Sequence, residues 1–111
     1  MGGGLLPVMG RLDFGWRLGS DGMPERAKMR CQRLPSEYLK LMYSDTITHS
    51  NHALSYLVNT MGSRNVLLGT DFPYDMGQYD IVSKINDMSS LNPEDKAFVM
   101  GENSSKLFKI K

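Results

Sequence analysis

Two aspartates and two histidines are the side chains of this sequence whose types and spacing indicate chemistry. Asp45 and Asp71 each follow a short apolar run, and His49 and His52 stand three residues apart at the expected start of a helix. Imidazole and carboxylate groups are the usual ligands of hydrolytic zinc, and residues at i and i+3 share one side of a helix. The four side chains form a candidate metal site, although histidines at helix starts are more often surface or capping residues.

Asp71 is the leading candidate because of the segment that precedes it. Val66–Gly69 is an apolar run too short for a helix, which is typical of a strand buried on both faces. In α/β folds the carboxyl ends of such strands carry the chemistry, because the strand fixes the backbone while the side chain faces the crevice above the sheet. The competing interpretation is that Asp71 caps the turn into Phe72 and Pro73 by accepting backbone N–H groups.

Other catalytic patterns are poorly supported. A triad of Ser44, His49 and Asp71 lacks the Gly-x-Ser-x-Gly elbow that exposes a nucleophilic serine. The glycines at positions 2–4 could approach a phosphate closely, but no strand pattern precedes them and no Lys-Ser or Lys-Thr follows. Cys31 is the single cysteine, which excludes an internal disulfide and fits a reducing compartment.

Composition narrows the classes of partner. Thirteen Lys and Arg residues against twelve Asp and Glu residues leave a net charge of +1, so we expect neither nucleic acid nor an anionic membrane as a partner. The sequence contains no apolar run of 18 residues and no signal-peptide pattern, and Leu6 stands where the myristoylation pattern requires Ser or Thr. We therefore expect a soluble, cytoplasmic protein.

The elements that position Asp71 are predicted to be α/β in type. Leu41–Ser44 and Val66–Gly69 are the expected strands. Between them a helix is expected to start at a Ser50 or Asn51 cap and to end at Gly62, with apolar residues at i, i+3, i+4 and i+7: Leu54, Leu57, Val58 and Met61. The order strand, helix, strand favours parallel pairing with a right-handed crossover.

The flanking segments are less regular. Residues 1–35 show no sustained period of 2 or 3.6 and are expected to be rich in loops. One further helix carries Ile81, Ile85 and Met88, and another is capped near Asn92 and ends at Gly101, before a final turn from Asn103 through Phe108. Two strands are too few for a complete parallel sheet, so residues 1–111 are expected to form one partial domain.

Several motifs in fixed order resemble one enzyme family. They are Gly2-Gly3-Gly4, Pro7, Gly10-Arg11, Tyr38-Leu39, Tyr43-x-Asp45-Thr46, His49, Ala53-Leu54, Gly62, Val66 to Pro73, and Gly101-x-Asn103. Their most specific part is Gly69-Thr70-Asp71-Phe72-Pro73 after an apolar strand. The chain is similar to the C-terminal third of amidohydrolase-related proteins of the aminocarboxymuconate-semialdehyde decarboxylase type.

The resemblance implies the C-terminal portion of a metal-dependent (β/α)8 TIM barrel, with Leu41–Ser44 as its seventh strand and Val66–Gly69 as its eighth. It implies that Asp71 is a ligand of a divalent metal, with zinc expected, and that a carboxylate there orients or deprotonates a bound water. It implies that Arg11 binds the carboxylate of a small substrate, since a guanidinium makes paired hydrogen bonds to that group. In decarboxylase members this contact sometimes crosses a subunit interface, so a homo-oligomer is also compatible.

The departures from the family pattern bear on activity. Met1 stands where members carry a histidine, the spacing from the glycines to Arg11 is one residue short, and the other family metal ligands belong to barrel segments outside this sequence. Since catalytic zinc takes about three protein ligands, we expect part of a decarboxylase or hydrolase that is inactive as an isolated chain.

The alternative is a small non-catalytic α/β module that binds a partner through exposed barrel edges. On either interpretation, Leu41, Val66 and Leu68 are expected to lack the neighbours that they would face in a closed barrel. The isolated chain is therefore expected to be marginally stable or prone to aggregation.

Overall fold

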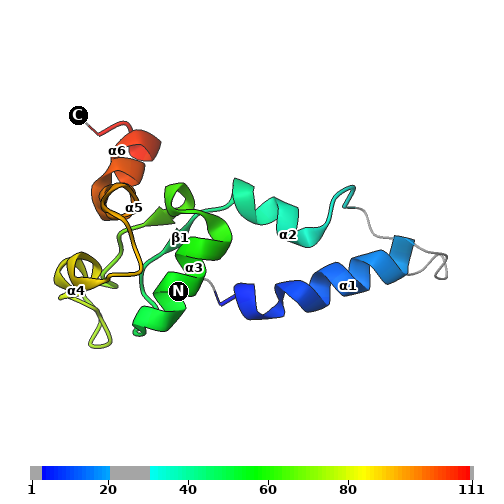
Figure 1. The fold of residues 1–111 in the computed structure, drawn as a ribbon, viewed down its shortest axis with the longest axis horizontal. Coiled ribbons are helices and arrows are strands. Elements are labelled where there is room, and N and C mark those ends of the chain that lie inside the picture. Colours follow the sequence, from blue (N-terminus) through cyan, green and yellow to red (C-terminus); the bar gives the residue numbers. More distant parts are fainter. Residues whose placement is uncertain (1–3, 21–30, 111) are drawn as a thin grey trace.

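The structure is a computed structural model that describes residues 4–20 and 31–110, and it consists of a packed body from which a helical arm projects (Figure 1). Its elements in chain order are the 3-10 turn Leu6–Val8, α1 (Met9–Ser20), α2 (Pro35–Tyr38), the 3-10 turn Leu39–Leu41, β1 (Ser44–Asp45), α3 (Asn51–Met61), the 3-10 turn Ser63–Asn65, β2 (Val66–Leu67), α4 (Ile81–Asp87), α5 (Pro93–Ala97), a π-helical turn (Phe98–Glu102) and α6 (Asn103–Phe108). No helix within these residues is both long enough and apolar enough to cross a membrane.

Strands β1 and β2 form a parallel pair, with Ser44 opposite Val66 and Asp45 opposite Leu67. The predicted strand, helix, strand order with parallel pairing is confirmed, and the α/β class with it. The first strand lies later than predicted, because Leu41 belongs to a 3-10 turn and β1 begins only at Ser44. The carbonyls of Lys40 and Met42 accept hydrogen bonds from the side-chain amide of Asn65, at 3.0 and 2.8 Å. Before β1, these bonds to a side chain stand where a strand would bond to the backbone of its neighbour.

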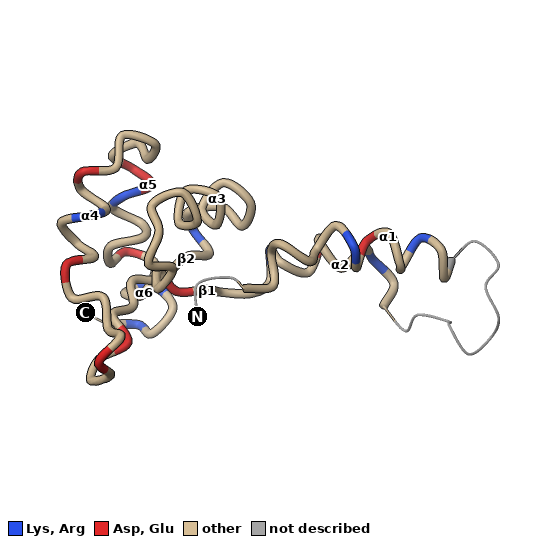
Figure 2. Tube along the Cα trace, turned by 90° about the horizontal axis from the view of Figure 1, so that it is seen from below, with Lys and Arg blue, Asp and Glu red and all other residues tan. Residues whose placement is uncertain are grey.

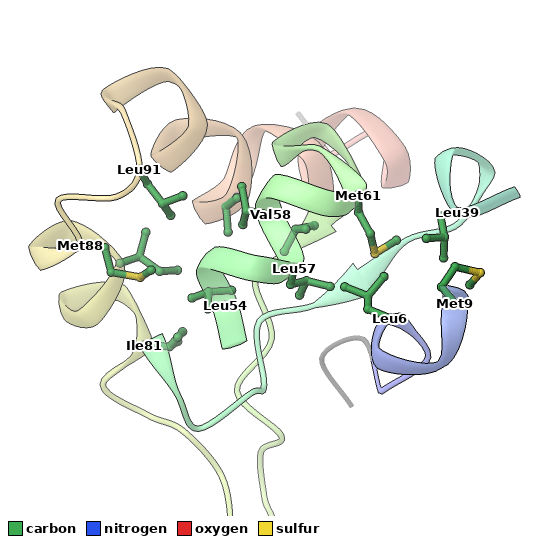
Figure 3. Packing of buried hydrophobic residues seen from close by; sticks show 13 residues of the cluster. Leu6, Met9, Leu39, Leu54, Leu57, Val58, Met61, Ile81, Met88 and Leu91 are labelled. Carbon is green, nitrogen blue, oxygen red and sulfur yellow. The ribbon is translucent and has the colours of Figure 1, made fainter. Parts of the chain in front are cut away.

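Helix α3 supplies the centre of the core, as its apolar spacing predicts (Figure 3). The Ser50 hydroxyl caps it by accepting from the Ala53 N–H, and Gly62 ends it with a φ of 88°. Its buried face is Leu54, Leu57, Val58 and Met61. It packs against a cluster from β2, α4, the loop before α5 and the C-terminal helices that includes Val66, Ile81, Ile85, Leu91 and Val99.

The expectation that strand residues lack neighbours is only partly right. Leu41 is 69% exposed, as expected, but Val66 is fully buried. Leu68 is half-buried and packs against the same cluster. The expectation for Val66 is wrong because α3 and the C-terminal helices fold over β2 and cover it without further strands.

The C-terminal helices run on further than predicted. The Asn92 cap is confirmed, since its side chain accepts from the Asp95 N–H at 2.8 Å. The predicted stop at Gly101 is wrong, because α5 continues through the π-helical turn into α6. A helical glycine costs only about 1 kcal/mol, and Asn103 ties the helix down by donating to the carbonyls of Ser63 and Val66 at 2.7 and 2.8 Å.

The secondary structure predicted from the sequence is most in error in the arm. Residues 9–20 form α1 where a loop was expected, whereas positions 1–3 and 21–30 of the same segment lie outside the described residues. Three glycines in α1 lower its helix propensity. Its contacts with α2 and the burial of Met9 at its base therefore contribute more to its stability than propensity does. Leu6 and Met9 lie beside Leu39 and Met61 where the arm meets the body (Figure 3).

The carboxyl ends of the two strands are joined by Thr46 and Gly69. The fully buried Thr46 hydroxyl donates to the Gly69 carbonyl at 3.0 Å and accepts from the Gly69 N–H at 3.1 Å. A Cβ at Gly69 would lie 3.1 Å from the Asp45 Cβ and 3.4 Å from the Ile47 Cδ1, so only glycine allows this approach without displacement. We call this contact the Thr46–Gly69 clasp.

We predict that Thr46→Val lowers the free energy of unfolding by about 1–3 kcal/mol, because valine keeps the shape and leaves two backbone groups of Gly69 unpaired. Urea denaturation measures the change, and hydrogen exchange of the Gly69 amide locates it. The matched control is Thr60→Val at an exposed position of α3, expected to change stability by less than about 0.5 kcal/mol. Equal stability of the two variants would show that the clasp contributes nothing.

A second prediction concerns Asp13, whose Oδ1 accepts from the Ser36 N–H at 2.8 Å and so caps α2 from α1. Hydrogen bonds from the side chain and the backbone of Ser36 lower the pKa of Asp13 below its ordinary value. A lowered folded-state pKa stabilises the contact above the unfolded value of 3.8 and loses that stabilisation as the pH falls through the folded value.

Asp13→Ala is therefore expected to lower the hydrogen-exchange protection factor of the Ser36 amide at neutral pH, and acidification below about pH 3.8 is expected to lower that protection factor in the unsubstituted chain. Asp87→Ala, at an exposed position of α4, is the control and should leave that amide unchanged. Exchange at Ser36 that does not respond to Asp13→Ala would exclude this capping role.

Candidate functional site

An open pocket of about 480 Å³ lies where the segments after β1 and β2 meet. It is lined mainly by apolar groups, with the residues Gly4, Leu6, Pro7, Ile47, Thr48, His49, Ala53, Tyr56, Asp71 and Met76. Its volume is in the range of small-molecule sites, which combine apolar walls with a few polar groups. We call it the Asp71 pocket.

Asp71 is held at this pocket in a left-handed backbone conformation, with a φ of 62°. The turn around it is built by other groups: the Thr70 hydroxyl accepts from the Phe72 N–H at 3.3 Å, and the Thr70 carbonyl accepts from the Gln78 N–H at 2.8 Å. The Asp71 backbone carbonyl accepts from the Tyr74 N–H at 2.9 Å. Thr70 thus supplies the side-chain acceptor of this turn, and within residues 4–20 and 31–110 the Asp71 carboxylate has no hydrogen-bond partner.

His49 occupies an equivalent position after β1. It also has a positive φ, 54°, and it lines the same pocket. The neighbouring turn holds it, because the Thr48 hydroxyl donates to the Ser50 carbonyl at 3.0 Å and Ser50 caps α3. Left-handed non-glycine residues cost of order 1 kcal/mol and gather at functional sites. Among the described residues only His49, Asp71 and Lys109 are of this kind, and two of the three face one pocket.

The remaining candidates lie elsewhere. The Asp45 Oδ1 accepts from the Ile47 N–H at 3.0 Å, and Asp45 is not among the residues that line the pocket. His52 is exposed in the first turn of α3, and Arg11 is exposed near the start of α1; neither lines the pocket. The structure therefore brings His49 and Asp71 to one pocket and leaves the other candidates outside it.

The pocket by itself does not fit a catalytic metal. Within the described residues no cluster of three or more His, Cys, Asp or Glu side chains could hold an ion. A catalytic zinc site takes about three protein ligands, whereas the pocket offers Asp71 and His49. A metal centre at this place would need ligands from beyond the described residues.

Tyr56 and Met76 are two of the lining residues that the sequence analysis did not predict for the site. Tyr56 lies on α3 away from its buried stripe and is 49% exposed, and Met76 lies in the loop after Asp71 and is 74% exposed. An aromatic residue outside the apolar stripe of an amphipathic helix was the one available signal for Tyr56. No local pattern marks Met76.

A second pocket, of about 590 Å³, lies at the opposite ends of the strands, where it is lined in part by Tyr43, Asn65 and Phe98. Arg64 stacks over the Phe98 ring at 4.0 Å and pairs with Glu94 at 3.4 Å, so its guanidinium already has partners. We therefore assign the candidate chemistry to the Asp71 pocket.

Comparison with known proteins supports the resemblance predicted from the motifs. The chain is 27% identical over 110 residues to the 2-amino-3-carboxymuconate-6-semialdehyde decarboxylase of Caenorhabditis elegans, an alignment that covers 98% of this chain and 26% of that protein. It is 30% identical over 104 residues to the protein of the same name in Dictyostelium discoideum, covering 93% of this chain and 28% of that protein. The chain thus spans about a quarter of the length of these curated relatives.

The match to a described family covers almost all of the chain, including the segments after β1 and β2 that contribute to the Asp71 pocket. Residues 9–110 match the Amidohydrolase family, a range that contains His49 and Asp71 as well as Arg11. The chain therefore belongs to the amidohydrolase family.

Proposed function

We propose that this chain forms the C-terminal part of a metal-dependent amidohydrolase-family enzyme that acts on a small carboxylate-bearing molecule, and that Asp71 is one of the metal ligands. The observation that carries the proposal is the position of Asp71, which follows β2 in a left-handed conformation with its carboxylate unpaired among the described residues. Because two similar proteins are named as decarboxylases, decarboxylation is favoured over hydrolysis as the reaction.

The arrangement of the strands supports assignment to a barrel. In a (β/α)8 barrel each parallel strand is followed by a helix, and the active site lies at the carboxyl ends of the strands. Here β1, α3 and β2 follow one another in that order, and His49 and Asp71 both come after the ends of their strands. We assign β1 and β2 to the seventh and eighth strands of such a barrel.

The proposal includes an incomplete metal centre. The Asp71 carboxylate suits a divalent cation, and zinc is the ion that the family resemblance implies. Because the pocket offers fewer ligands than a catalytic zinc site needs, the isolated chain is proposed to be inactive until further ligands complete the site. The single cysteine, Cys31, supports a cytoplasmic location.

Arg11 has a different proposed place in the enzyme. Arg11 is exposed near the start of α1 and is not among the residues that line the Asp71 pocket. Helix α1, with its blue Arg segments, belongs to the arm that projects from the body (Figure 2). A guanidinium binds a carboxylate through paired hydrogen bonds. We propose that Arg11 contributes this contact to a site shared with another copy of the chain, in a homo-oligomer.

A second candidate function is a non-catalytic module that binds another polypeptide. Leu41, Met42 and Tyr43 precede β1 and are 69%, 46% and 50% exposed. Strand β1 is paired only with β2 among the described residues, so one of its edges is open to a further strand. Exposed apolar groups beside an open strand edge favour such binding.

The proposed role of Asp71 predicts weak, localised binding of a divalent cation. In NMR titrations with Mn²⁺, a paramagnetic probe, we expect the strongest line broadening at the amides around Asp71. Asp71→Asn is expected to weaken this binding about tenfold, equivalent to about 1.4 kcal/mol, because it removes the charged ligand. Asp75→Asn, in the same exposed loop but outside the pocket lining, is the matched control.

Metal analysis of the purified chain provides the complementary measurement, and we expect much less than one metal ion per chain. Broadening centred away from Asp71, or equal loss in the Asp71 and Asp75 variants, would overturn the assignment of Asp71 as a ligand. A full equivalent of metal retained by Asp71→Asn would do the same.

A further inference from the structure

We propose that His49 is the group that binds the carboxylate of a small ligand in the Asp71 pocket. The proposal rests on the proposed function and extends it, because it assigns a role to a second residue of the same site. The ligand class is a small molecule with an apolar body and a carboxylate.

The first argument is the way in which His49 is held. Its φ of 54° lies in the left-handed region that non-glycine residues seldom adopt, and the turn is secured on the carboxyl side by Ser50 and on the amino side by Thr48. The Thr48 N–H adds a bond to the Thr46 carbonyl at 2.9 Å, which links this turn to the Thr46–Gly69 clasp. The backbone thus presents the imidazole to the pocket at a conformational cost.

The second argument is that the imidazole is available. Within residues 4–20 and 31–110, His49 takes part in no side-chain hydrogen bond or ion pair, although it lines a pocket. The other histidine, His52, has no place in that lining. Of the two histidines, only His49 therefore both lines the pocket and has an imidazole available to a ligand.

The third argument is charge. The described residues that line the pocket include no Lys or Arg, so His49 is the one lining side chain among them that can become positively charged. Asp71 is the negative counterpart, and it repels an anionic ligand unless a cation neutralises it. Apolar groups such as Leu6, Ile47 and Met76 provide the surface for the hydrocarbon part of the ligand.

Benzoate is a suitable probe because it combines an apolar ring with one carboxylate. The chain has two histidines, so a carbon-edited NMR spectrum of its imidazole groups contains the signals of His49 and His52 only. Benzoate is expected to shift the His49 signal progressively to saturation and to leave the His52 signal in place.

Three substitutions sharpen the test. His49→Asn is expected to weaken benzoate binding about tenfold, and asparagine tolerates the left-handed backbone, so the fold is retained. His52→Asn is the matched control and should bind like the unsubstituted chain. Asp71→Asn should bind benzoate more tightly, because it removes a repelling charge, whereas the same variant loses Mn²⁺.

The outcomes separate this inference from the proposed function. Absence of saturable benzoate binding, equal shifts of both histidines, or unchanged affinity of His49→Asn would each overturn the role of His49 and leave the Mn²⁺ result at Asp71 intact. Mn²⁺ broadening away from Asp71 combined with a His49-dependent benzoate site would instead remove Asp71 as a metal ligand and keep the carboxylate site. Thermal unfolding of each variant shows whether it remains folded.

Discussion

The candidate site depends on the Thr46–Gly69 clasp. The two strands share only two residue pairs, which is a short ladder for holding two loops in register. The buried hydroxyl of Thr46 extends that ladder by bonding both backbone groups of Gly69, and the absence of a side chain at Gly69 allows the close approach. His49 lies three residues beyond one end of the clasp and Asp71 two residues beyond the other. Their shared pocket exists because these two strand ends are fastened together.

The site and the core are stabilised in different ways. Burial of apolar side chains from α3, such as Leu54 and Leu57, stabilises the body without regard to direction. The loops of the site instead rely on hydrogen bonds from short polar side chains, Thr48 after β1 and Thr70 after β2, which hold His49 and Asp71 in left-handed conformations. Directional bonds are suited to this task, because a site requires a defined geometry as well as burial.

Local sequence patterns account for most of the helices and for the order of the strands. Helix α3 and the Asn92 cap are readable because each depends on residues three or four positions apart. Helix α1 escapes such reasoning, since its glycines obscure the pattern and its contacts with α2 come from a distant part of the chain. The helix likewise passes through Gly101 because Asn103 bonds to carbonyls about 40 positions away in the sequence.

Asp71 could be singled out from sequence because an apolar strand followed by a carboxylate is a local arrangement. The residues that share its pocket could not be identified from the sequence, because His49, His52 and Asp45 look equally suitable along the chain. Parallel pairing and the clasp bring His49 to the pocket, the start of α3 places His52 outside its lining, and the bond from Ile47 engages Asp45 in a turn. Sequence spacing therefore identified the types of group available for chemistry, whereas their meeting at one pocket depends on hydrogen bonds between segments that are 23 residues apart.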